Sequence, residues 1–340
     1  MVKSIALENS VIDWLLGEDQ PSVRYFTLTE LLGRSQEDSD VRFSRENITN
    51  FGWARDILAG QASNGCWAVD ETPHARNGRP WRSWPKYTST NWMLLILSDL
   101  GLTKDEPRIE KACRIWMKRY DMRDGGFNDE PHDKEGHLCI TGNTARALVR
   151  FGYVDHPRVR RAFEWLVRNQ ADGGGWDCFH RRGTLDSWEP LSAFAVYPRE
   201  KWTPSMKHAV ERGAEFFLER QLHRQKSRYE PWYRFHYPVH YYYDLLVGLD
   251  FMTALGYSKD KRLGYAIRLL RKKRRADGRW NLDAINPEAE SPQGKWDKSH
   301  PNEASIPFAL EKVGEPSKMI TLRAMTVLHR LNESEVTSEE

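Results

Sequence analysis

The stretch 155–176, DHPRVRRAFEWLVRNQADGGGW, predicts an amphipathic α-helix that is closed at both ends. Its apolar residues recur at intervals of three and four positions, so they form one stripe of a helix with arginines on the opposite face. These apolar residues are Val159, Ala162, Phe163, Leu166 and Val167. Pro157 suits a first helical turn, and the glycines at 173–175 permit a tight turn that ends at Trp176.

The same unit recurs along the chain. Residues 105–127, DEPRIEKACRIWMKRYDMRDGGF, align with the first stretch almost residue for residue, and looser copies occur elsewhere. Each copy ends at an aromatic residue, called here the landing aromatic; these residues are Trp67, Phe127, Trp176, Trp232 and Trp280. Their separation of about 50 to 60 residues is typical of stacked or closed arrays of one repeated unit.

A second type of helix alternates with these amphipathic ones. It is apolar on more than one side, as in WMLLIL (92–97) and LLVGLDFMTAL (245–255), and it ends at a glycine that suits a helix C-cap. A helix that is apolar all round belongs inside a protein, and an arginine-studded helix belongs outside. The inner and outer helices pair as 21–32 with 38–61, 88–100 with 105–120, 139–151 with 155–170, 189–198 with 204–222, 239–255 with 258–275, and 302–313 with 316–331.

This alternation predicts an all-α protein with one domain, residues 1–340, that forms an (α/α)6 toroid. Six helical hairpins would occupy residues 21–331, after an entry helix within 1–20 and before a flexible tail at 332–340. An open helical solenoid is the alternative architecture.

The long connections predict which end of the barrel carries function. Each returns from an outer helix to the next inner helix, so in a closed barrel all of them lie where the inner helices begin. They are residues 68–87, 128–138, 177–188, 223–238 and 281–301. We call this end the loop rim, and the opposite end, with its short glycine turns, the glycine rim. We expect a site at the loop rim and little to bind a ligand at the glycine rim, although the loops could simply cap the barrel.

Composition limits the partners and the compartment. The chain has 51 Lys plus Arg and 48 Asp plus Glu, a balance that gives no reason to expect nucleic acid as a partner. Its four cysteines form no CxxC pair, its start lacks the apolar core of a signal peptide, and no window approaches about 20 apolar residues. We therefore expect a cytoplasmic protein without a transmembrane segment.

A basic run, RKKRR at 271–275, leaves room for peripheral contact with an anionic membrane, a diphosphate or RNA, although such runs are more often solvated helix faces. The sequence identifies no cofactor and no oligomeric state.

The repeats resemble those of the terpenoid cyclase and protein prenyltransferase superfamily, whose members are six-hairpin α/α toroids. Its squalene cyclase branch carries the QW repeat: an aromatic residue, an aliphatic run, a Gln and then Gly-x-Trp. Here the repeat reads Phe163, Leu166, Val167, Gln170, Gly174 and Trp176, with a second copy at Gln61, Gly65 and Trp67. The resemblance covers residues 50–331 and implies the fold, with the Gln and Trp side chains tying outer helices together.

The chain departs from the superfamily at the catalytic motifs. Class II cyclases protonate their substrate with an Asp-x-Asp-Asp motif, which does not occur here; the nearest string, Asp38-Ser39-Asp40, lies in a hairpin turn at the glycine rim. Protein prenyltransferases hold zinc with an Asp and a Cys separated by one residue and a His, whereas Asp177 and Cys178 are adjacent here, with His180 close by. The resemblance therefore indicates the fold and does not assign a reaction.

The densest group of reactive side chains is FHYPVHYYYD at 235–244. His240 and Asp244 are four residues apart, so on a helix that begins near residue 239 they would share one face and form an acid–base pair directed into the cavity. Neighbouring tyrosines such as Tyr241 could bind a polar substrate or offer π faces to a carbocation. The alternative is a buried His–Asp pair that only rigidifies the helix.

Further candidates lie where the other inner helices begin. Glu189 is a candidate general acid if burial favours its protonated form, and capping of the helix N-terminus is the alternative role. The candidate substrate-binding residues are Tyr87, Asn91, His137, Asn143, Trp188, His236, Tyr241, His300 and Glu303. With His240, Asp244 and Glu189 as catalytic residues, they form the predicted site.

Two groups contain the residue types that bind metals. One comprises Asp129, His132, Asp133, His137 and Cys139, and the other Asp177, Cys178 and His180. Neither has a recognised zinc spacing, so we assign no metal site from the sequence.

Three hypotheses for function follow. The first is a toroid enzyme that acts on an isoprenoid or another large apolar substrate, because an aromatic-lined barrel would shield a cation from water. The second is a glycan lyase or hydrolase, which would show a groove lined by carboxylates and arginines. The third is a non-catalytic binding or scaffold toroid with its cavity filled by side chains. The sequence leaves open whether the chain is an enzyme.

Overall fold

The protein is described here from a computed structural model, which covers the chain outside several loops and the ends. The described residues are 2–67, 75–76, 79–80, 87–119, 121–129, 134–177, 185, 187–225, 228–240, 242–285 and 309–336.

Helices make up nearly all the regular structure of these residues. The longer ones are α1 (Val2–Leu15), α2 (Pro21–Phe26), α3 (Ser39–Asn47), α4 (Gly52–Ala59), α5 (Thr90–Asp99), α6 (Pro107–Arg119), α7 (Leu138–Arg150), α8 (Pro157–Arg168), α9 (Glu189–Val196), α10 (Pro204–Glu219), α11 (Leu245–Ala254), α12 (Gly264–Lys272) and α14 (Lys318–Val336). A π-helical turn, η1 (Thr27–Leu31), continues α2, and 3-10 turns occupy η2 (Arg199–Lys201), η3 (Glu230–Tyr233) and η4 (Lys261–Leu263). Two short antiparallel strands, β1 (Ala75–Arg76) and β2 (Arg79–Pro80), form a hairpin that the sequence did not predict.

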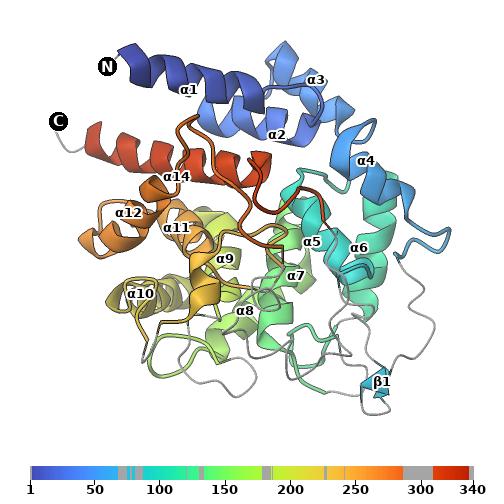
Figure 1. Cartoon of the computed structure of the whole chain (residues 1–340). Coiled ribbons are helices and arrows are strands. Elements are labelled where there is room, and N and C mark those ends of the chain that lie inside the picture. The colour runs from blue at the N-terminus through green and yellow to red at the C-terminus, as the bar shows by residue number, and fades with distance from the viewer. Residues whose placement is uncertain are drawn as a thin grey trace.

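Two layers of helices confirm the predicted all-α toroid architecture. Helices α5, α7, α9 and α11 form an inner layer in which each contacts the next, and all ten residues of α5 are buried. Helices α6, α8, α10 and α12 lie outside them and bury one face each (Figure 1). The closest packing is between α7 and α9, because Gly142 has no side chain: a Cβ there would lie 2.7 Å from the Cβ of Glu189.

The predicted outer helix 38–61 is instead two helices, α3 and α4. The chain turns between Asn47 and Gly52, and Gly52 has a positive φ of 77°, which a residue with a side chain rarely adopts. The turn is held from outside, since the Trp53 N–H donates to Oε1 of Gln20 at 3.1 Å.

The predicted last hairpin, 302–313 with 316–331, is contradicted in part. Residues 309–313 are not helical, and 302–308 lie outside the described residues. Helix α14, predicted as an outer helix, packs against α11 on one side and against η1 and α2 on the other (Figure 1). It therefore takes an inner position and closes the ring between the fifth inner helix and the first.

A repeated hydrogen bond explains why α14 is an inner helix. The backbone N–H of the landing aromatic Trp280 donates to Oγ1 of Thr321 in α14 at 3.0 Å. The equivalent bonds join Trp67 to Thr90 at the start of α5, at 3.0 Å, and Phe127 to Thr141 in α7, at 2.9 Å. We call this bond the threonine rung; it places α14 in the same structural role as α5 and α7.

The landing tryptophans also bind backward to the helix that precedes them. In three copies the indole Nε1–H donates to the carbonyl ten residues earlier: Trp67 to Ile57 at 2.6 Å, Trp176 to Leu166 at 2.8 Å, and Trp280 to Leu270 at 2.8 Å. Each of these tryptophans is buried, so the indole N–H would otherwise lack a partner. The constant separation sets the length of the glycine turn between helix and tryptophan.

The repeated glutamines join neighbouring outer helices. Nε2 of Gln170 donates to the carbonyl of Gly174 at 2.7 Å and to that of Ala209 in α10 at 2.8 Å. Gln61 makes the same pair of bonds, to Gly65 at 3.0 Å and to Arg108 in α6 at 3.1 Å. One side chain thus closes its own turn and holds the next outer helix.

The threonine rung in α14 yields a first prediction. Thr321→Val keeps the shape of the side chain but leaves the buried Trp280 N–H without an acceptor, so we expect a loss of about 1–3 kcal/mol in the free energy of unfolding. Urea denaturation followed by tryptophan fluorescence measures it. Thr321→Ser, which keeps the hydroxyl, is the control and should lose less. Equal stability of Thr321→Val and the unchanged protein would contradict the stabilising role assigned to the threonine rung.

Candidate functional site

Asp244, predicted to pair with His240 at the loop rim, pairs with a different histidine. Helix α11 begins at Leu245, so His240 and Asp244 precede it and do not share a helical face. Asp244 is the N-cap, with Oδ1 accepting from the Val247 N–H at 2.8 Å. Its Oδ2 accepts from the backbone N–H of His236 at 3.0 Å and lies 2.6 Å from Nδ1 of the same histidine. The predicted i, i+4 pair is therefore wrong, because capping of α11 turns the carboxylate toward His236.

The His236–Asp244 pair is fully enclosed. Both side chains are at most 1% exposed, and Nε2 of His236 faces the carbonyl of Val239 at 3.3 Å. Both ring nitrogens thus face oxygen atoms of the segment 236–244. The pair fixes the backbone that leads into α11.

His240 lies next to this pair, in a strained conformation. Its φ is 45°, in the left-handed region that residues other than glycine rarely adopt, and Tyr87 has a φ of 70°. The two rings stack with centroids 4.9 Å apart, and the Trp92 ring meets His240 edge-on at 5.2 Å. Nδ2 of Asn143 donates to the His240 carbonyl at 3.0 Å. Left-handed backbone at non-glycine residues tends to gather at functional sites and costs roughly 1–3 kcal/mol each.

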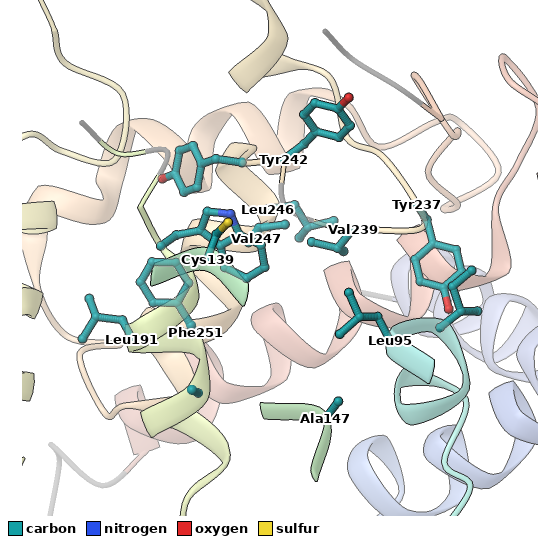
Figure 2. Packing of buried hydrophobic residues seen from close by; sticks show 14 of the residues in the cluster. Leu95, Cys139, Ala147, Leu191, Tyr237, Val239, Tyr242, Leu246, Val247 and Phe251 are labelled. Atoms are coloured by element: carbon teal, nitrogen blue, oxygen red, sulfur yellow. The ribbon is translucent and has the colours of Figure 1, made fainter. Parts of the chain in front are cut away.

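Tyr242 completes an aromatic cluster around His240. Its hydroxyl contacts that of Tyr87, and its ring lies edge-on to His236 with centroids 6.0 Å apart. Figure 2 shows Tyr242 above apolar side chains of α7, α9 and α11, among them Cys139, Leu191 and Val247. The cluster is thus a buried aromatic layer at the loop rim.

The other predicted residues divide into three groups. Glu189 and Trp188 are buried at the start of α9, and Asn91 is buried in α5, so they lie at the same rim as His240. His137 is half-buried, and its Nδ1 lies 3.2 Å from Sγ of Cys139. Tyr241, His300 and Glu303 lie outside the described residues.

The glycine rim contradicts the prediction that it offers little to a ligand. A pocket of about 450 Å³ opens there, between the last turns of α5, α7, α9 and α11 and the facing sides of η1 and α14. Charged side chains line much of it: Glu30, Arg45, Asp99, Arg150, Asp250, Arg323 and Arg330. Glu30, Asp99, Arg150 and Asp250 come from segments predicted as inner helices, and the sequence analysis assigned no role to their charges.

Asp99 is the centre of the charges in this pocket. It is only 5% exposed in its side chain, and it pairs with Arg150 and, at 3.0 Å, with Arg323. Burial alone would raise the pKa of Asp99, but the two guanidinium groups outweigh it and hold that pKa below its ordinary value. Asp250 pairs separately with Arg330 at 2.8 Å.

Residue types for metal binding do not gather among the described residues, where no three His, Cys, Asp or Glu side chains lie close enough to share an ion. Four of the residues considered from the sequence, His132, Asp133, Cys178 and His180, lie outside that part of the chain. Its helices are also each too short or too polar to cross a membrane.

The fold and its repeats resemble those of the squalene cyclase-like toroids. Over 95 residues it is 30% identical to squalene–hopene cyclase of Bradyrhizobium diazoefficiens, a match that covers 25% of the chain and 14% of that protein's length. The chain therefore spans only a small part of the curated relative that it matches. No protein-family profile matches it.

Two solved structures overlay on most of the chain. A protein from Actinoplanes overlays with a TM-score of 0.47 and 16% identity, over 97% of this chain and 99% of the other. The type II terpene cyclase MstE from Scytonema overlays with a TM-score of 0.44 and 14% identity, over 94% and 88% of the respective chains.

Glu30 in the pocket yields a prediction of pH dependence. Burial raises its pKa above the ordinary value of 4.5, against the opposing effect of Arg330. The folded protein therefore holds this proton more tightly than the unfolded chain, so the stabilisation is complete below pH 4.5 and is lost as the pH rises through the folded-state pKa.

Glu30→Gln imitates the protonated form, so we expect it to raise the melting temperature at pH 7.5 and to change it little at pH 4.5. Differential scanning calorimetry at both pH values measures this, with Glu211→Gln on the exposed face of α10 as the control. A melting temperature unchanged at pH 7.5 would contradict the cost assigned to the ionised carboxylate.

Proposed function

We propose that this protein is a toroid enzyme that acts on an isoprenoid or another large apolar substrate at the loop rim. One observation carries the proposal: Tyr87 and Trp92 pack against His240, whose backbone is held in a left-handed conformation, and Tyr242 packs against Tyr87. Aromatic faces stabilise cations, and an enclosed apolar site keeps water from a reactive intermediate. The resemblance to squalene cyclase-like toroids supports the same substrate class.

The proposed roles follow the positions of the side chains. Glu189, buried at the start of α9, is the proposed proton donor, and His240 is the proposed group that removes a proton from the cationic intermediate. Asp244 acts through His236 by fixing the segment that carries His240. Asn143 holds the same segment through the His240 carbonyl.

A non-catalytic binding toroid is the second candidate, and a specific observation favours it. Polar groups at the loop rim bond to one another: Asp244 to His236, Tyr87 to Tyr242, and Asn143 to the backbone of His240. Such mutual bonding is also what a rim built only for stability would show. Turnover distinguishes the two candidates.

The test incubates the purified protein with prenyl diphosphates, squalene and squalene epoxide and analyses products by mass spectrometry. We expect a cyclised or rearranged product, reduced at least about 100-fold by His240→Ala and by Glu189→Gln, the scale of loss typical for a removed acid or base. His208→Ala, on the exposed face of α10, is the matched control and should keep full activity.

A panel of polysaccharides tests the glycan alternative, whose predicted carboxylate and arginine lining occurs in the pocket at the glycine rim. Product from a glycan and none from a terpenoid would replace the proposal. A bound lipid on extraction without any turnover would favour the binding toroid.

A further inference from the structure

The pocket at the glycine rim has more positive than negative side chains around it. Four arginines line it, against the carboxylates of Glu30, Asp99 and Asp250. A fifth guanidinium, that of Arg146, lies behind the wall, where its Nη1 donates to Oγ of the lining residue Ser192 at 3.1 Å. Burial raises the pKa of Glu30, which weakens the negative side further.

Arg146 is the unusual member of this set. The residue is 4% exposed, and its Nε and Nη2 atoms have no hydrogen-bond partner among the described residues. Its ring contact is with Trp188, 5.0 Å from the guanidinium carbon. Burial lowers the pKa of Arg146 to about 10, although the charge of Asp99 opposes this. A buried charge without a bonded counter-ion costs several kcal/mol, and an anion nearby offsets that cost.

The two arginines on Asp99 keep donors for a ligand. Arg150 donates from Nη1 to one oxygen of Asp99, and Arg323 donates from Nη2 to the other. A guanidinium has five N–H donors in all. The remaining donors suit the paired oxygens of a carboxylate. Apolar side chains supply another part of the lining, beside hydroxyl groups such as that of Ser192; they are Phe26, Ala195, Val196, Phe251, Ala254, Met319 and Leu322.

The C-termini of the inner helices favour a ligand with a single negative charge. Several inner helices end at this rim, and each C-terminus contributes a partial negative charge of about half a unit within its last turn. These partial charges offset some of the arginine surplus, so a ligand with one negative charge fits better than a diphosphate. The volume of about 450 Å³ lies in the usual range for small-molecule sites, roughly 300–1,000 Å³.

We infer that this pocket is a second ligand site, which binds an apolar carboxylic acid with its carboxylate on Arg150 and Arg323 and its apolar body against Phe26, Phe251 and Leu322. The site lies at the opposite end of the toroid from His240, and its occupancy does not depend on the proposed reaction there.

Isothermal titration calorimetry of the full chain with decanoate tests the inference, with decanol and decylammonium as probes of the same apolar length. We expect decanoate to bind at least 10-fold more tightly than either. Arg150→Gln should remove most of that preference without changing the affinity for decanol, whereas Arg114→Gln, exposed on α6, should leave both unchanged.

Two further arms keep the inference open to refutation. Ala254→Leu fills the pocket without changing its charge and should weaken decanoate and decanol alike, which separates loss of the site from loss of the fold; circular dichroism checks the fold. Inorganic diphosphate should bind no more tightly than decanoate. Equal affinities of the unchanged protein for decanoate and decanol, tighter binding of diphosphate, or decanoate binding that survives Arg150→Gln and Ala254→Leu would each overturn it.

Discussion

The threonine rung is the interaction on which the ring of inner helices depends. A landing aromatic is buried between the outer helix it leaves and the inner helix it precedes, so its backbone N–H has no water to bond. The next inner helix supplies Oγ1 of Thr90, Thr141 or Thr321, and in the tryptophan copies the indole N–H returns to the outer helix ten residues back. A single residue thus fixes the positions of two helices in different layers, which is why the unit can repeat around a closed ring.

The periodicity of the sequence predicted the outer helices and most of the inner ones, because burial on one face or on all faces leaves a direct trace in residue order. It failed at the last hairpin. Helix α14 carries Arg323 and Arg330, which are typical of an outer helix, yet both face the pocket and pair with Asp99 and Asp250. Side-chain charge alone could not distinguish an inner helix with internal ion pairs from a solvated one. Thr321, three residues after the first residue of α14, was the available clue.

At the loop rim, several of the predicted residues lie together, but two of them were paired wrongly. His236, His240, Asp244, Tyr87 and Asn143 do lie together, because inner-helix starts converge in a closed ring. The predicted pairing was wrong because Asp244 is the N-cap of α11, a role that aspartate often has before an apolar helix. The helix therefore begins after Asp244, and the carboxylate does not face His240. The pocket at the glycine rim could not be predicted from the sequence, since its charged side chains come from six separate elements and lie together only in the folded protein.

Helix dipoles explain the positions of some charged side chains at each end of the toroid. The charged side chains that they do not explain lie at the pocket. Asp244 caps α11 and Glu189 lies in the first turn of α9, so acids sit where helix N-termini are positive. Arg150, in the last turn of α7, has the complementary role at the other end. Arg146 is one turn deeper, and Arg323 lies in the first half of α14, so neither serves a helix C-terminus. Asp99 compensates one of these two charges. The other, Arg146, has no bonded counter-ion among the described residues, and it bonds to Ser192 in the wall of the pocket, where an anion from solution would offset its charge.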